Sequence, residues 1–160
     1  MNRRVKLDRI DRKILKELQR DGRITNVDLA KIAGISAPPC LRRVRALEEA
    51  GYIKGYHADL NAPMMGYGIT VFAQVGLSSQ AKDDLRKFEE LIGSWPEVRE
   101  AHMLAGEADF LLKIVAADWD EYQQFLTTRL TAAPAVNQVK SSLAISTAKY
   151  EPGVPVDTAD

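Results

Sequence analysis

Residues 25–50 read Thr-Asn-Val-Asp-Leu-Ala-Lys-Ile-Ala-Gly-Ile-Ser-Ala-Pro-Pro-Cys-Leu-Arg-Arg-Val-Arg-Ala-Leu-Glu-Glu-Ala. This stretch predicts two short helices joined by a tight turn. Thr25 is suited to cap the first helix, with Asp28 in the position of a capping-box partner. Gly34 fits the turn, because glycine readily adopts the left-handed conformation that ends many helices. Ser36 is placed to cap the second helix. The stretch therefore has the pattern of a helix-turn-helix.

The second of these helices is expected to have one apolar and one basic face. Pro38 and Pro39 fall in its first turn, where their missing N–H groups cost little. Its expected inward stripe consists of Leu41, Val44 and Leu47. The residues expected to face outward are Arg42, Arg43 and Arg45. Such a helix suits the major groove of DNA, with Ser36, Pro38 and Pro39 near the base edges.

Arginine can bind guanine through two hydrogen bonds, and the sequence leaves open whether Arg42 or Arg43 makes such a contact. The alternative is a set of ion pairs along the helix surface with Glu48 or Glu49. We favour DNA contact, because three arginines within four residues exceed what those two acids require.

A further helix is expected before this stretch. Asp8 is a candidate N-cap with Asp11 as its capping-box partner, and Gly22 is expected to end the helix. After the arginine-rich helix, Tyr52–Leu60 alternates apolar and polar residues, which predicts a short strand or hairpin wing. Residues 1–60 are thus expected to form a winged helix-turn-helix. Its candidates for phosphate contact, with solvated surface charge as the alternative, are Arg3, Arg4, Lys6 and Lys54.

Composition limits the class of protein. Residues 1–60 carry 14 Lys and Arg against 8 Asp and Glu, a net charge of +6, and the rest of the chain carries −6. This asymmetry predicts that only the first half meets a polyanion. No apolar run is long enough to span a membrane, and the N-terminus lacks the pattern of a signal peptide. One cysteine excludes an internal disulfide framework and suits a cytoplasmic protein, and one cysteine with two distant histidines argues against a structural zinc site. We expect no metal and no cofactor.

Residues 61–68 hold one proline and two glycines and are expected to be a linker. In residues 69–150 strands alternate with helices, and the expected strands are Ile69–Leu77, Val98–Ala105, Phe110–Ala116 and Val136–Lys149. The expected helices are Ser79–Ile92 and one capped by Asp118 with Glu121. This order, βαββαβ, predicts an α+β fold of the ferredoxin-like type. Residues 151–160 are expected to be a tail with little order.

Both faces of the predicted sheet carry apolar residues, as in Thr70-Val71-Phe72-Ala73. Helices can cover only one face, so we expect the other face to pair with a second copy of the chain. A homodimer also suits a protein that reads palindromic operators in double-stranded DNA, because its two recognition helices would lie one DNA turn apart.

The turn Gly106–Asp109 is the strongest sign of a small-molecule site. Glycine allows a ligand to approach the backbone, and the Asp109 carboxylate can accept hydrogen bonds from an ammonium group. The alternative is that this segment is only a hairpin turn.

These segments together resemble the Lrp/AsnC family of regulators, closest to its leucine-responsive branch, over residues 6–149. The matching pieces are Leu7-Asp-Arg-Ile-Asp-Arg-Lys-Ile-Leu, Leu18-Gln-Arg-Asp-Gly-Arg-Ile24, Pro39-Cys-Leu-Arg-Arg-Val-Arg-Ala-Leu-Glu48, Gly51-Tyr-Ile-Lys-Gly-Tyr56 and Gly106-Glu-Ala-Asp-Phe110. The resemblance implies a winged helix-turn-helix followed by an amino-acid-sensing, ACT-like βαββαβ domain. It also implies dimers that assemble further, for example into an octamer.

The resemblance places an amino-acid effector, leucine or another, between subunits near Gly106 and Asp109. Leu104 and Ala105 would then offer backbone groups to it. The last strand of family members often carries two threonines at alternate positions, where this chain has Val139 and Ser141. This difference leaves the ligand specificity open.

We expect a sequence-specific transcriptional regulator, not an enzyme. His102 is a candidate base, but no serine or cysteine nucleophile neighbours it in the sequence. The alternative function is an architectural DNA-organising protein that does not respond to small molecules. Cys40 is expected to be a packing residue of the DNA-binding domain.

Overall fold

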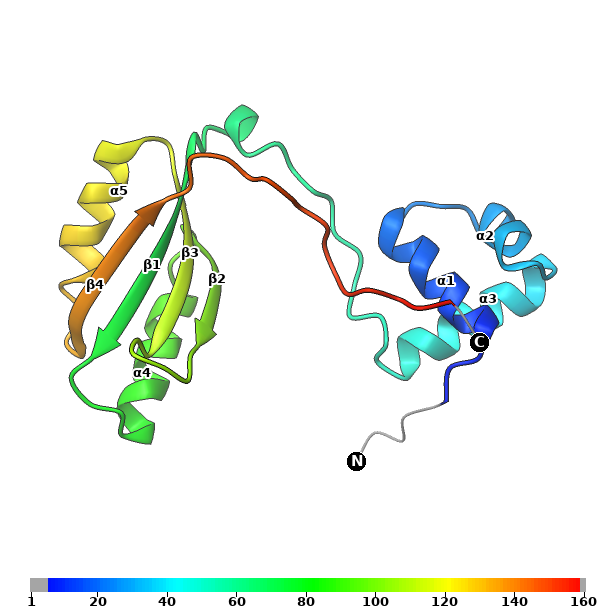
Figure 1. Ribbon diagram of the computed structural model, residues 1–160, viewed down its shortest axis with the longest axis horizontal. Coiled ribbons are helices and arrows are strands. Elements are labelled where there is room, and N and C mark those ends of the chain that lie inside the picture. Colours follow the sequence, from blue (N-terminus) through cyan, green and yellow to red (C-terminus); the bar gives the residue numbers. More distant parts are fainter. Residues whose placement is uncertain (1–5, 159–160) are drawn as a thin grey trace. The chain divides into compact units, whose positions relative to one another are not determined.

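The computed structural model describes residues 6–158 and divides the chain into two compact units (Figure 1). One unit holds the chain up to Asp59 together with the segment from Lys149 onward, and the other is Leu60–Ala148. Arg3 and Arg4, two of the predicted phosphate contacts, lie outside the described residues. The described part of the chain has no helix that is long and apolar enough to cross a membrane.

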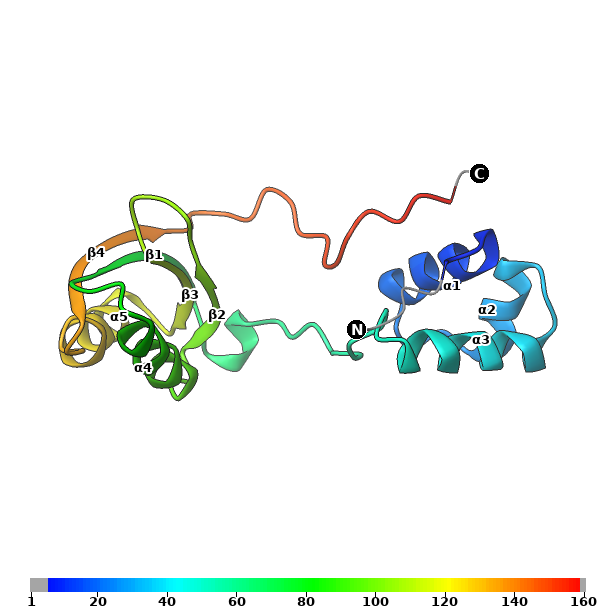
Figure 2. The ribbon, with the colours of Figure 1, turned by 90° about the horizontal axis from the view of Figure 1, so that it is seen from below.

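The first unit is built on three helices, α1 (Arg9–Arg20), α2 (Asn26–Ala33) and α3 (Ala37–Glu49) (Figure 2). Asp8 and Asp11 form the predicted capping box of α1, and Thr25 accepts the Asp28 N–H at the start of α2. Gly34 ends α2 with a φ of 76°, a conformation that favours glycine. The buried core residues that join the three helices are Ile14, Leu29, Ala30, Ala33, Cys40 and Leu47.

Residues 52–60 are extended but pair with no described strand in this single chain. A two-stranded hairpin that no third strand supports is at best marginally stable in water. The segment instead folds back onto α3, where the Tyr56 hydroxyl donates a hydrogen bond to Glu48 at 2.9 Å. Burial, followed by the nearby Glu48 carboxylate, raises the pKa of Tyr56 to about 12, so this hydroxyl keeps its proton at neutral pH.

The second unit is a four-stranded antiparallel sheet in the order β2-β3-β1-β4. Its strands are β1 (Ile69–Leu77), β2 (Val98–Met103), β3 (Phe110–Ala116) and β4 (Val136–Leu143). Helices α4 (Lys82–Gly93) and α5 (Trp119–Phe125), the latter continued by a π-helical turn (Leu126–Leu130), cover one face of the sheet (Figure 2). This is the predicted ferredoxin-like arrangement. A 3₁₀ turn, Pro63–Met65, lies within the expected linker.

Several elements are shorter than the sequence pattern predicts, and strand pairing explains the main case. The predicted last strand reaches Lys149, whereas β4 ends at Leu143. Leu143 pairs with Val71, and Ala144 donates to the carbonyl of Thr70, so β1 offers almost no backbone beyond this point. Two other elements are also shorter than predicted: α4 begins at Lys82 instead of Ser79, and β2 ends at Met103 instead of Ala105.

The sheet buries one face and leaves the other open. Alternate residues of β1 and β3 are fully buried beneath the helices, and Phe88 and Phe110 are in ring contact there. The open face mixes polar and apolar groups: Phe72 is 39 % exposed and lies opposite Lys113. Lys113 pairs with Glu100 at 2.7 Å, and this hydrogen bond is the main cause that lowers the pKa of Glu100. The open face is therefore less apolar than the alternation predicts.

Candidate nucleic-acid interface and effector turn

The outward surface of α3 is the candidate DNA-reading face. Pro38, Arg42 and Arg45 are exposed, while Cys40 and Leu47 are buried against α1 and α2. Residues three and four apart share a helix face, so Pro38, Arg42 and Arg45 lie in one row. Two guanidinium groups therefore extend from a helix whose opposite side is fixed in the core.

The first turn of α3 is held to α2 by a side-chain contact. Ser36 occupies the N-cap position and is exposed, but its side chain makes no capping hydrogen bond in the described structure. Instead, the Asn26 side chain donates to the carbonyl of Ala37 at 2.8 Å. Pro38 and Pro39 lie in the first turn as predicted, with Pro39 half-buried.

Leu41 is 40 % exposed, although the apolar pattern predicts that it faces inward. Cys40 and Leu41 are neighbours, and successive helical residues point about 100° apart, so both cannot lie at the centre of the buried stripe. The small Cys40 side chain takes the buried position. The position of Cys40, four residues before the half-buried Val44 and seven before the buried Leu47, is the signal in the sequence that could have indicated this choice. Leu41 thus joins Pro38, Arg42 and Arg45 on the outward side.

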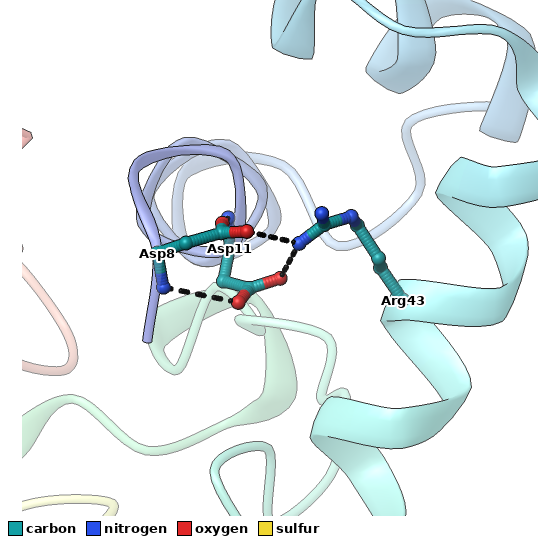
Figure 3. A network of polar contacts seen from close by, with 3 residues as sticks. All are labelled: Asp8, Asp11 and Arg43. Carbon is teal, nitrogen blue, oxygen red and sulfur yellow. Dashed lines mark hydrogen bonds and ion pairs between the residues drawn. The ribbon is translucent and has the colours of Figure 1, made fainter. Parts of the chain in front are cut away.

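Arg43 differs from its two arginine neighbours. Its Nη1 atom lies 2.7 Å from a carboxylate oxygen of Asp8 and 2.7 Å from one of Asp11 (Figure 3). The Asp11 backbone N–H and the Arg43 guanidinium hold the pKa of Asp8 below its usual value. Arg43 therefore joins α3 to the capping box of α1. Of the two residues predicted for guanine contact, only Arg42 belongs to the exposed row.

Lys54 lies beyond the end of α3, in the extended segment that follows it, and its side chain is exposed. Lys6 is also exposed, just before the capping box of α1. Neither belongs to the row on α3. Both can serve the role predicted for them, because phosphate contacts require charge and reach rather than a fixed groove position.

The second candidate site is the turn between β2 and β3. Leu104 donates its backbone N–H to the Asp109 carbonyl at 2.8 Å, and Asp109 donates its own to the Val75 carbonyl at 2.9 Å. The Asp109 carboxylate accepts the Leu77 N–H at 2.7 Å and the Gln80 side-chain amide at 2.8 Å. Asp109 thus holds the end of β1, where the pairing with β4 shifts its register. Gln80 lies between β1 and α4, and it is a partner of this turn that the sequence pattern does not indicate.

Gly106 is exposed, and the protein itself does not require glycine there. Its backbone is not among the left-handed glycines of the chain, and a Cβ at this position would meet no described atom within 4 Å. Ala105 beside it is exposed, and Leu104 is 39 % exposed. The residues that the sequence predicts for the effector therefore lie together on an accessible turn.

A small polar cleft of about 50 Å³ borders this turn on the open side of the sheet. It is lined by Gln74, Gly76, Glu107, Ala108, Gln138 and Lys140. A water molecule occupies about 30 Å³ of liquid volume, so the cleft in one chain is too small to enclose an amino acid. A ligand at the turn would need further walls, which a second subunit could supply.

The other residues named in the sequence analysis lie against neighbouring residues of the fold. Ser141 lies on β4, and its hydroxyl is bonded to that of the buried Tyr122, whereas Val139 is half-buried opposite Val75. His102 lies 3.5 Å from Glu100 on the open face of the sheet. Among residues 6–158, no three His, Cys, Asp or Glu side chains come together as metal ligands. Cys40 is buried, as expected of a packing residue, and burial raises the pKa of its thiol.

Comparison with known proteins relates both units of the chain to one family. Residues 7–54 match the family model described as winged helix-turn-helix DNA-binding, and residues 70–154 match the Lrp/AsnC ligand binding domain. The chain is 55 % identical over 146 residues to the leucine-responsive regulatory protein of Rhizobium meliloti, covering 91 % of this chain and 94 % of that one. It is 43 % identical over 150 residues to the Bkd operon transcriptional regulator of Pseudomonas aeruginosa, covering 94 % and 98 %.

A solved structure shows the same fold. The chain superposes with a TM-score of 0.91 on a transcriptional regulator of Neisseria meningitidis that was crystallised as a complex with L-methionine. The two sequences are 34 % identical, and the match covers 95 % of this chain and 98 % of the other. The similarity thus spans both units of the chain.

Proposed function

The chain belongs to the Lrp/AsnC family of transcriptional regulators, and from that premise we propose that an amino acid bound at the Gly106–Asp109 turn controls how it binds its operators. The relatives that match 91 % and 94 % of the chain are regulators, so His102 is assigned no catalytic role. The observation that carries the proposal is the accessible turn itself, where Gly106 leaves open space beside the half-buried carboxylate of Asp109.

Asp109 can serve both the turn and a ligand. An ionised carboxylate has about four acceptor positions, and two of them are used by Leu77 and Gln80. The remaining positions can accept hydrogen bonds from the ammonium group of an amino acid, and the backbone N–H groups of Ala105 and Gly106 can donate to its carboxylate. The N–H of Leu104 is already bonded to the Asp109 carbonyl, so Leu104 would offer its own carbonyl to the ammonium group. The L-methionine complex of the Neisseria meningitidis regulator supports this ligand class, with leucine or another amino acid as the effector here.

The ligand site is completed by a second copy of the chain in this proposal. The cleft beside the turn holds only about 50 Å³. On the open face of the sheet, Phe72 is exposed two residues before the cleft residue Gln74 on β1. A homodimer formed through this face would add the missing walls. Further assembly, for example into an octamer, would use surfaces beyond this face.

For DNA, the exposed row on α3 is proposed to enter the major groove. Arg42 and Arg45 supply donors for the base edges, and the exposed Leu41 suits the methyl group of thymine. Ser36, Pro38 and Pro39 lie at the end of the helix that approaches the bases, and Lys54 and Lys6 contact phosphates. A dimer carrying two such helices would read a palindromic operator.

A thermal-shift screen with the twenty amino acids tests the effector proposal. A ligand present at about one hundred times its dissociation constant stabilises the native state by about 2.7 kcal/mol, so at least one amino acid should raise the melting temperature. The N-acetylated form of that amino acid is the control, because it lacks the ammonium group and should give no shift. No shift with any of the twenty would instead favour an architectural DNA-organising protein.

A further inference from the structure

The C-terminal segment, from Lys149 onward, belongs to the same compact unit as α1 and contacts that helix (Figure 1). The Gln19 side chain binds both polar groups of the Val154 backbone. Its Nε2 donates to the Val154 carbonyl at 2.8 Å, and its Oε1 accepts the Val154 N–H at 3.0 Å. A side-chain amide has both a donor and an acceptor, so it can bond the N–H and the carbonyl of one residue as a neighbouring strand would.

A second contact lies two helical turns away on the same helix. Arg12 Nη1 donates to the carbonyl oxygen of Asp157 at 3.4 Å. Arg12 and Gln19 are seven residues apart, which places them on one face of α1 at a separation of about 10 Å along the axis. Val154 and Asp157 are three residues apart, and an extended chain also spans about 10 Å over that distance. The spacing of the two side chains therefore matches the spacing of the two backbone groups.

Gly153 makes the approach of this segment possible. Its φ is 91°, in the region that favours glycine, and a Cβ at this position would clash with Gln19 Oε1. The side chain of Val154 is 66 % exposed, so the recognition uses the backbone and the glycine, not an apolar pocket.

We propose that the Arg12–Gln19 face of α1 is a binding site for the chain's own C-terminal segment. Because this segment follows β4, its docking joins the two units at a second place, in addition to the connection after Asp59. A unit joined at two places has less freedom to reorient than a unit on a single tether. The docked segment therefore restrains the DNA-binding unit with respect to the sheet domain that senses the effector.

Deuterium exchange of the full-length protein, followed by mass spectrometry of the C-terminal peptide, tests this site without DNA or effector. The Val154 N–H should exchange about tenfold or more slowly than an unprotected amide. Gln19→Ala and Gly153→Ala act on opposite sides of the contact, and each should remove that protection. Gln124→Ala, the same change at an exposed position of α5, should leave it intact.

Rapid exchange at Val154 in the wild type would overturn the proposal, as would full protection in both Gln19→Ala and Gly153→Ala. Mixing distinguishes the chain's own segment from that of a second copy. Chains with Gln19→Ala keep the segment, and chains that end at Tyr150 keep Gln19. If re-assembled mixtures of the two recover protection, the segment docks on a neighbouring copy and the proposal is wrong. Continued rapid exchange in the mixture supports docking within one chain.

Discussion

Arg43 shows how one residue of an arginine cluster can have a different role from its neighbours. A single nitrogen of its guanidinium group contacts Asp8 and Asp11, the two acids that also cap α1 (Figure 3). The contact connects the start of the first helix to the middle of α3. It fixes the orientation of α3, and through it the directions in which Arg42 and Arg45 extend.

Replacing Arg43 with methionine should therefore lower the stability of the protein. The ion pairs are partly exposed, since the side chain of Arg43 is 33 % exposed and that of Asp8 50 %. Solvent screening limits the expected loss to about 1–2 kcal/mol in the free energy of unfolding, measured with urea at neutral pH. Arg42→Met is the matched control, because Arg42 lies outside this ion-pair network, and its stability should stay within about 0.5 kcal/mol of the wild type.

The loss in Arg43→Met should also depend on pH. The pKa of Asp8 is lowered in the folded state, so its contribution is fully present above its unfolded value of 3.8 and is lost as the pH falls through the folded value. The difference between wild type and Arg43→Met should thus shrink in acid below about pH 4. Equal stability of the two proteins at neutral pH would show that the network does not hold α3.

On the level of elements, α3 combines a buried side with a row of exposed groups, and Arg42 is its central cation. Arg42→Ala should reduce the discrimination between operator and mutated operator by about 1–3 kcal/mol, the value of a bidentate contact with guanine. Lys54→Ala should instead weaken binding to all sequences. The slope of log affinity against log salt concentration should become shallower by about one. Fluorescence anisotropy with labelled duplexes at several salt concentrations separates these effects.

Arg86→Ala, which removes an exposed arginine from α4 in the other unit, is the control for both variants and should leave discrimination and salt dependence unchanged. If Arg42→Ala and Arg45→Ala both retain full discrimination while folded, the row on α3 does not read bases.

The helices and strands follow from local signals, and the errors arise where a distant partner decides. The caps at Asp8, Thr25 and Asp118 form as the sequence predicts, because each involves residues only three positions apart. Residues 52–60 form no paired strand, and β4 ends early, because strand pairing depends on a second segment. The two roles within the arginine cluster were unpredictable for the same reason, since the acids that bind Arg43 lie more than thirty residues away.

For the whole molecule, the order of the two units was predictable from charge and periodicity, but their second connection was not. The C-terminal segment has few apolar residues and two prolines, a composition typical of loose tails. Its docking depends on a matched distance between Arg12 and Gln19 and on the backbone freedom of Gly153, which no local pattern reveals. The candidate effector turn was predictable because its residues are contiguous, whereas its hydrogen-bonded partner Gln80 was not.

The central claim is that an amino acid at this turn changes how the protein binds DNA. The most direct measurement is operator affinity with and without the amino acid that gives the thermal shift, in the wild type and in Asp109→Asn. Asparagine can still accept the Leu77 N–H and pair with Gln80, but it lacks the charge that an ammonium group requires. Asp120→Asn, an exposed change on α5, is the matched control.

We predict that the amino acid changes wild-type affinity by about 5- to 150-fold, the usual range of coupling between two sites. Asp109→Asn should bind the operator as the wild type does without effector and lose most of the response, while Asp120→Asn responds fully. A full response in folded Asp109→Asn would remove this carboxylate from the site. Identical operator affinities with and without the amino acid in the wild type would contradict the claim itself.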